Sequence, residues 1–85
     1  MGRWISSPSY QAAVRVLVEA RKAAGVTQRQ LAGRLGRPYT MIANIERGER
    51  RVDVVEFVAI ARALGITELD LMTTISAVIG PDVQL

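Results

Sequence analysis

The sequence predicts an all-α fold, a compact bundle of five short helices within one small domain. Apolar residues recur three and four positions apart instead of alternating, which is the spacing of amphipathic helices. A Ser, Thr or Asp precedes four of the five apolar segments, where its side chain can cap a helix. A glycine follows each of the five, at the position where a chain leaving a helix often takes a positive φ.

The first helix is predicted over residues 8–24, after a short extension formed by residues 1–7. Ser7 can accept a backbone N–H of the first turn. Pro8 suits the first helical position, because an N–H there would have no partner within the helix. Gly25 is placed to end the helix.

The first helix carries more apolar surface than one packed face needs. Val14 and Val18 form a stripe beside the inward one, and Val16 is a third, exposed candidate. Either the N-terminal segment or another subunit is expected to cover this surface. Within the extension, Trp4 and Ile5 can pack on the first helix, dock on a second copy or lie disordered.

Residues 27–48 have the pattern of two short helices joined by a tight turn. Thr27 can cap the second helix, and Gly36 directly after that helix makes the corner. The third helix is expected over residues 38–47, with Pro38 in its first turn. This is the spacing of a helix-turn-helix. The apolar residues expected to fill the wedge between the two helices are Leu31, Ala32, Leu35, Ile42 and Ile45.

A fourth helix is predicted after the basic loop that follows, because Asp53 and Glu56 have the spacing of a capping box. The fifth helix is expected over residues 67–79, within a domain of residues 8–80 and before a tail of residues 81–85. This last helix stays apolar over much of its circumference, so we expect it to form the interface of a homodimer. The residues expected in that interface are Leu71, Met72, Ile75, Val78 and Ile79.

Composition argues against several classes of site. The chain has no Cys and no His, which removes the common zinc ligands and the commonest acid–base residue, so we expect neither a metal nor a cofactor. The eight carboxylates form no clear catalytic constellation, and an enzyme is the least favoured interpretation. Because no apolar run suits a membrane span or a signal peptide, the sequence indicates a cytoplasmic protein.

Charge is distributed unevenly along the chain. Residues 1–51 hold ten of the eleven Lys and Arg residues and a balance of +7, whereas residues 52–85 have a balance of −4. The basic half contains the helix-turn-helix pattern. A basic half of this kind is typical of proteins that bind a polyanion, so nucleic acid is the favoured partner.

Four short segments, Gly-Val-Thr-Gln, Leu-Gly, Ile-Glu-Arg-Gly and Ala-Leu-Gly, stand at characteristic spacings between about residues 17 and 72. The residues concerned are Gly25, Thr27, Gln28, Leu31, Ala32, Leu35, Gly36, Ile42, Ile45, Glu46, Gly48, Ala61, Ala63, Leu64 and Gly65. On these residues the chain resembles the phage Cro/repressor-type (XRE-like) family of DNA-binding domains. The resemblance implies the lambda-repressor-like helix-turn-helix fold and binding to double-stranded DNA.

In this family the third helix enters the major groove and the second crosses the DNA backbone. The residues implied to face bases are Tyr39, Thr40, Met41, Ala43 and Asn44. The candidates for phosphate contacts are Gln28, Arg29, Arg34, Arg37, Arg47, Arg50 and Arg51. Among the first group, Asn44 can make a bidentate pair with adenine. Arg21 and Glu46 match a structural ion pair of the family, which would tie the first helix to the end of the third.

Two residues depart from the family pattern. Arg37 stands where the family usually has an apolar residue, so its side chain is expected to point to the DNA backbone instead of the core. Pro38 stands where the family usually has Ser or Thr. Because Pro38 has no side-chain acceptor, the third helix is expected to begin within about one residue of it.

The favoured function is a transcriptional repressor, of bacterial or phage type, that binds a palindromic operator as a homodimer on the nucleoid. Two alternatives stay open. The first is an antitoxin that also controls its own operon, with the apolar surplus of the first and fifth helices covered by a toxin. The second is a protein-interaction module of the same fold that has lost DNA binding.

Overall fold

Helices are the only regular elements in residues 7–85, which is the range that the structure, a computed structural model, describes. They are α1 (Pro8–Ala23), α2 (Gln28–Leu35), α3 (Tyr39–Glu46), α4 (Val54–Ala63) and α5 (Glu68–Ile79). This confirms the predicted all-α fold of five helices. None of these helices is long and apolar enough to cross a bilayer. Trp4 and Ile5 lie outside the described residues.

The helices begin and end where backbone hydrogen bonding requires it. At the start of α2, the Gln30 N–H donates to Thr27 Oγ1 at 3.0 Å, and the Thr27 N–H donates to Gln30 Oε1 at 2.9 Å. Gly36 ends α2 with φ 65° and ψ 34°, a left-handed conformation that would strain a residue with a side chain. The next N–H, that of Arg37, donates to the Ala32 carbonyl at 3.0 Å and closes the corner before α3.

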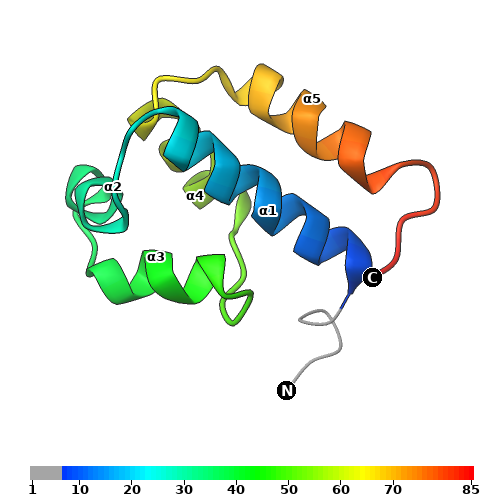
Figure 1. Cartoon of the computed structure of the whole chain (residues 1–85), viewed down its shortest axis with the longest axis horizontal. Helices are drawn as coiled ribbons and strands as arrows, with labels where there is room; N and C mark the ends of the chain where they lie inside the picture. Colours follow the sequence, from blue (N-terminus) through cyan, green and yellow to red (C-terminus); the bar gives the residue numbers. More distant parts are fainter. Residues whose placement is uncertain (1–6) are drawn as a thin grey trace.

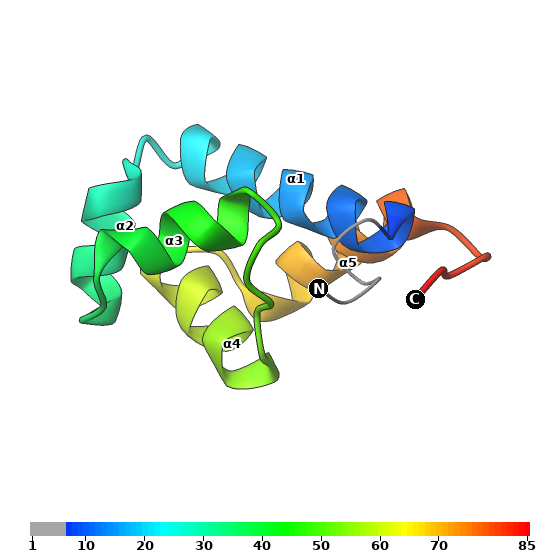
Figure 2. The ribbon, with the colours of Figure 1, turned by 90° about the horizontal axis from the view of Figure 1, so that it is seen from below.

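α1 runs through the middle of the molecule, and α5 lies along one side of it (Figure 1). α2 and α3 pack against each other at the other side, and α4 lies behind α1 in contact with α2 and α5. Seen from below, α3 lies on an outer surface (Figure 2). Side chains from all five helices meet in one core, whose main members are Leu17, Leu31, Ile42, Ile45, Ile60, Ala61, Leu71 and Ile75.

α5 covers apolar surface of α1 that the sequence assigns to the N-terminal segment or to another subunit. Val16, expected to be exposed, is buried in the core beside α5. Leu71 and Ile75, predicted at a subunit interface, are only 3% and 7% exposed within the protomer. That part of the predicted interface is wrong, because Leu71 and Ile75 form the stripe of α5 that packs into the core of the same chain.

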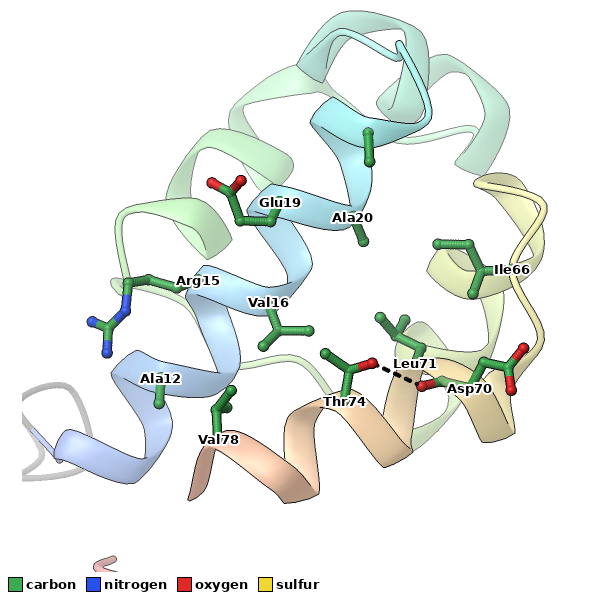
Figure 3. A pocket seen from close by; sticks show the side chains of 11 residues that line it. Ala12, Arg15, Val16, Glu19, Ala20, Ile66, Asp70, Leu71, Thr74 and Val78 are labelled. Atoms are coloured by element: carbon green, nitrogen blue, oxygen red, sulfur yellow. Dashed lines mark hydrogen bonds between the residues drawn. The ribbon is translucent and has the colours of Figure 1, made fainter. Parts of the chain in front are cut away.

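The apolar surface that stays exposed on α5 lies beside this stripe. Met72 and Val78 are about half exposed, whereas Ile79 packs partly against the core. Val78 also lines an apolar groove of about 660 Å³ between α1 and α5 (Figure 3). Arg15 and Glu19 on α1 and Asp70 on α5 also line this groove, and their charged ends point away from the space between the two helices (Figure 3). The described protomer therefore presents a largely apolar hollow on the side of α1 where α5 lies.

Candidate nucleic-acid interface

α3 begins at Tyr39, with Pro38 as its N-cap instead of its first helical residue. Pro38 has φ −61° and ψ 145°, and no side chain accepts an N–H of the first turn. The helix therefore starts one residue later than the expected range of 38–47. The ψ angle of Pro38 is that of extended backbone, and the proline side chain has no oxygen that could cap the first turn. The first turn of α3 is exposed, with Tyr39 and Thr40 at its surface.

Burial along α3 divides the helix into two faces. Ile42, Ala43 and Ile45 are buried, and Met41 packs partly against the core. Ala43 is therefore withdrawn from the predicted base contacts, because its side of the helix is occupied by the bundle, whereas Met41 is partly exposed and its base contact stays a prediction. The residues at the surface are spaced four and then three apart, which keeps them on one side of a helix. We call this set the outer face of α3, and its members are Thr40, Asn44 and Arg47.

Tyr39 stands next to the outer face and is held by α2. The guanidinium carbon of Arg29, from the first turn of α2, lies 4.0 Å from the centroid of the Tyr39 ring. At this distance the cation is attracted to the electron-rich face of the ring. The contact joins the first turns of the two helices of the motif, and both residues are exposed at the surface.

Asn44 and Arg47 contact each other on the outer face. The Arg47 guanidinium donates to Asn44 Oδ1, and its Nε lies 3.4 Å from Glu49 Oε1. A bidentate pair between Asn44 and adenine needs this amide oxygen as an acceptor. Arg47 occupies one of the two lone pairs of this oxygen. Movement of Arg47 away from Asn44 would leave the amide oxygen fully open to adenine and free the guanidinium for another acceptor.

The opposite side of α3 ends in a buried charge cluster, formed by Arg21, Gln28 and Glu46. Arg21 Nε and Nη2 donate to the two carboxylate oxygens of Glu46 at 2.6 and 3.0 Å, and Gln28 Nε2 donates to Glu46 Oε1 at 2.9 Å. The side chains of Arg21 and Glu46 are only 11% and 10% exposed. The hydrogen bonds to Glu46 raise the pKa of the Arg21 guanidinium above its usual value.

This cluster links three parts of the fold. Arg21 also donates from Nη1 to the Val26 carbonyl at 2.8 Å, in the loop between α1 and α2. The pair thus ties α1 to the end of α3, while Gln28 ties the start of α2 to the same carboxylate. The amide of Gln28 faces this carboxylate, which leaves it less available for the predicted phosphate contact. No buried side-chain nitrogen or oxygen in residues 7–85 lacks a hydrogen-bond partner.

Two of the arginines predicted to bind phosphate are engaged inside the protomer. Arg50 Nη2 and Nη1 donate to the two carboxylate oxygens of Glu56 at 2.8 and 3.0 Å. These bonds lower the pKa of Glu56 to about 2. Arg34 Nη1 donates to the Ala63 carbonyl at 2.7 Å and ties α2 to the end of α4. The phosphate contacts of Arg34 and Arg50 stay predictions, and these bonds within the protomer leave fewer of their donors for DNA.

The other predicted phosphate contacts keep exposed guanidinium groups around the motif. Arg37 lies in the corner between α2 and α3, Arg47 lies at the end of α3, and Arg51 lies in the loop before α4 with its guanidinium carbon 5.9 Å from the Tyr10 ring centroid. Together with Arg29, which stacks on Tyr39, they place positive charge at both ends of α3.

Sequence reasoning missed the contacts that the outer-face residues make with one another. Asn44 and Arg47 are three residues apart on a helix, a spacing that predicts contact. The stacking of Arg29 on Tyr39 joins two helices across a corner, and no spacing rule indicates it. Arg50 and Glu56 face each other only because the loop folds back against the start of α4.

The helix-turn-helix family model matches residues 17–71, from within α1 to the first turn of α5. Among curated proteins, an uncharacterized HTH-type transcriptional regulator of Sinorhizobium fredii is 32% identical over 53 residues, which cover 62% of this chain and 69% of that protein.

Two solved structures resemble the whole arrangement of helices. An XRE-family like protein from Pseudomonas syringae has a TM-score of 0.78 and 44% identity, over 86% of this chain and 88% of its own. The clp gene regulator ClgR from Corynebacterium glutamicum has a TM-score of 0.73 and 25% identity, over 81% of this chain and 73% of its own.

Proposed function

The chain belongs to the XRE family of helix-turn-helix DNA-binding transcriptional regulators, and on this premise we propose that it is a sequence-specific repressor. It binds a palindromic operator as a homodimer, with α3 of each protomer in the major groove. Repression follows when the bound dimer blocks access of RNA polymerase to a promoter. The protein acts in the cytoplasm, on the nucleoid, and needs neither a metal nor a cofactor.

The observation that carries this proposal is the outer face of α3. Thr40, which is exposed, and Asn44, which is partly exposed, lie on one side of a helix of eight residues, and Arg47 caps the C-terminal end of that helix. Such a helix is about 12 Å long, and the major groove is wide enough to admit a helix with its side chains. The buried charge cluster holds the other side of α3 against the bundle, so the outer face is presented as a rigid surface.

The residues on and around this face divide into two roles. Tyr39, Thr40 and Asn44 read base edges, and Asn44 reads adenine once Arg47 has moved from its amide oxygen. Arg37, Arg47 and Arg51 contact phosphates, which sets the affinity and its dependence on salt. Movement of Arg47 from Asn44 to a phosphate would therefore couple phosphate binding to base recognition.

Homodimer formation has separate support on α5. Met72 and Val78 are exposed although they are apolar, and the groove between α1 and α5 is lined mostly by apolar side chains. Val78 belongs to this groove, and Met72 lines a second apolar hollow on the other side of the Leu71 and Ile75 stripe. A second copy that covers either hollow would bury surface that is unfavourable in water. A toxin or another regulatory protein would use the same surface, and the test of oligomeric state below distinguishes these occupants.

Selection of bound sites from random duplexes tests the proposed DNA recognition. We expect the wild type to enrich one sequence and Thr40→Ala/Asn44→Ala to lose that enrichment while staying folded. Arg62→Ala is the matched control for loss of a surface arginine, because Arg62 lies on α4 and pairs with Glu68. This control should enrich the wild-type sequence. If folded wild type enriches no sequence, the proposal is wrong.

Sedimentation of the purified chain tests the dimer. A mass near twice 9.3 kDa is expected at micromolar concentration, and the selected site should contain two symmetric half-sites. Met72→Asp/Val78→Asp should give a folded monomer that binds a half-site weakly. A wild-type monomer, or a stable complex of unlike chains purified from the host, would contradict the homodimer.

A further inference from the structure

We propose that Arg29 is a positioning residue for Tyr39, and that the pair recognises the 5-methyl group of a thymine in the major groove. This inference rests on the proposed function, because it needs α3 to lie against the bases. It changes the role of Arg29 from a phosphate contact to a support for an aromatic side chain. It also gives Tyr39 a defined target on the base edge.

The contact between Arg29 and Tyr39 joins two helices of the motif. Arg29 comes from the first turn of α2 and Tyr39 from the first residue of α3, so neither residue is near the other in sequence. The guanidinium carbon lies 4.0 Å from the ring centroid, a distance at which the planar cation covers one face of the ring. Arginine suits this position better than lysine, because its flat guanidinium stacks on aromatic faces.

Part of the Tyr39 ring stays exposed to solvent. Tyr39 is 40% exposed although one ring face is next to Arg29. No hydrogen bond of its hydroxyl is found within residues 7–85, so the stacked guanidinium is the polar contact that orients the ring there. Without Arg29, the ring would lose that contact and gain rotational freedom at the exposed start of the helix.

An exposed apolar ring at the start of α3 suits an apolar group on the DNA. Ala43 is buried and Met41 packs partly against the core, so Tyr39 is the most exposed large apolar side chain of α3. Of the base edges in the major groove, thymine presents a methyl group, and apolar side chains recognise it by contact. A ring held in one orientation gains this contact without first losing rotational freedom.

The test removes one methyl group at a time from the DNA. In a duplex that carries the selected site, each thymine is replaced in turn by uracil, which pairs in the same way but lacks the methyl group. Wild type should lose about fourfold in affinity at one thymine of each half-site, the factor expected for one buried methyl group. Tyr39→Phe should keep this discrimination, because it keeps the ring.

Arg29→Ala should bind the thymine and uracil duplexes with equal affinity, although it remains folded by circular dichroism. Arg37→Ala is the matched control, because it removes an exposed arginine that is not stacked on Tyr39. It should weaken binding to both duplexes and keep the fourfold ratio between them. This difference separates loss of positioning from loss of charge.

The outcomes are distinct. If Arg29→Ala keeps the thymine preference and only weakens binding uniformly, Arg29 contacts phosphate and the inference is wrong. If wild type binds its selected site but no uracil substitution changes affinity, the inference is wrong while the proposed function stands. If wild type selects no site at all, the proposed function fails first, and this inference fails with it.

Discussion

The two sides of α3 use charged groups in opposite ways. On the inner side, Glu46 is 10% exposed and accepts three hydrogen bonds from Arg21 and Gln28. On the outer side, Arg47 is more than half exposed, and its guanidinium contacts Asn44 and Glu49. The inner side therefore fixes the orientation of the helix. The outer side has polar groups that can exchange their partners for DNA.

The arginines show the same difference. Arg21 and Arg50 each face a carboxylate with two donors, and both hold one element of the fold to another. Arg37 is exposed, and no hydrogen bond of its side chain is found in the described chain. Formal charge alone does not separate these roles. Arg21 and Arg50 each donate to both oxygens of one carboxylate, whereas Arg47 has a single, longer contact with the exposed Glu49 carboxylate.

Loss of the inner carboxylate should have the largest effect on stability. Glu46→Ala leaves the Arg21 guanidinium buried without its partner, so we expect the free energy of unfolding to fall by about 3–5 kcal/mol. Urea denaturation followed by circular dichroism measures this change. A loss below about 1 kcal/mol would show that the cluster does not hold α3, and the contrast between the two sides would disappear.

Change on the outer face should affect binding and leave stability alone. Asn44→Ala is expected to weaken binding to the selected site by roughly 1–3 kcal/mol, because a bidentate base contact is lost. Binding to random duplex should change much less, and the free energy of unfolding should stay within about 0.5 kcal/mol. Fluorescence anisotropy on both duplexes checks this; an equal loss on both would assign Asn44 to the phosphates.

Arg37→Ala should produce a smaller and more uniform effect. Affinity for every duplex should decrease by a similar factor, and the slope of log K against log salt should fall in magnitude by about 1. Titrations at several salt concentrations measure both quantities. An unchanged slope would place Arg37 away from the DNA backbone.

The smallest expected effect is the loss of stability when the Arg50–Glu56 pair is broken at acid pH. The pKa of Glu56 is lowered from 4.5 to about 2 in the fold, so its charged form stabilises the native state above pH 4.5. This contribution is lost as the pH falls from about 4.5 toward 2. Because Arg50 is partly exposed, we expect it to be about 1 kcal/mol. Glu56→Gln should lack this part of the acid dependence, and identical profiles for both proteins would contradict the assignment.

Local chemistry made most helix boundaries predictable. Thr27 and Asp53 cap their helices as their sequence neighbours indicate, and Gly36 turns the corner with positive φ. Pro38 shows the limit of such signals, because the same residue type suits an N-cap and the first helical position, and the structure uses it as the cap. The Arg21–Glu46 contact was expected only through the family resemblance, since residues 25 positions apart carry no local signal.

Partners across the fold were harder to predict. An apolar stripe on α5 shows that something covers it, but it does not distinguish a second protomer from α1 of the same chain. For this reason the sequence predicts Leu71 and Ile75 at an interface, although they belong to the core. It predicts Ala43 against bases for a related reason, because α3 has a broader buried side than its isoleucines alone indicate.

An NMR titration of the ¹⁵N-labelled protein with its selected duplex tests most directly whether α3 lies in the major groove. We expect the largest shifts at the backbone amides of Tyr39, Thr40, Asn44 and Arg47, with smaller ones in the first turn of α2. The amides of α5 should move little once the dimer is formed. Large shifts confined to α4 and α5, with the amides of α3 unchanged, would contradict placement of this helix in the groove.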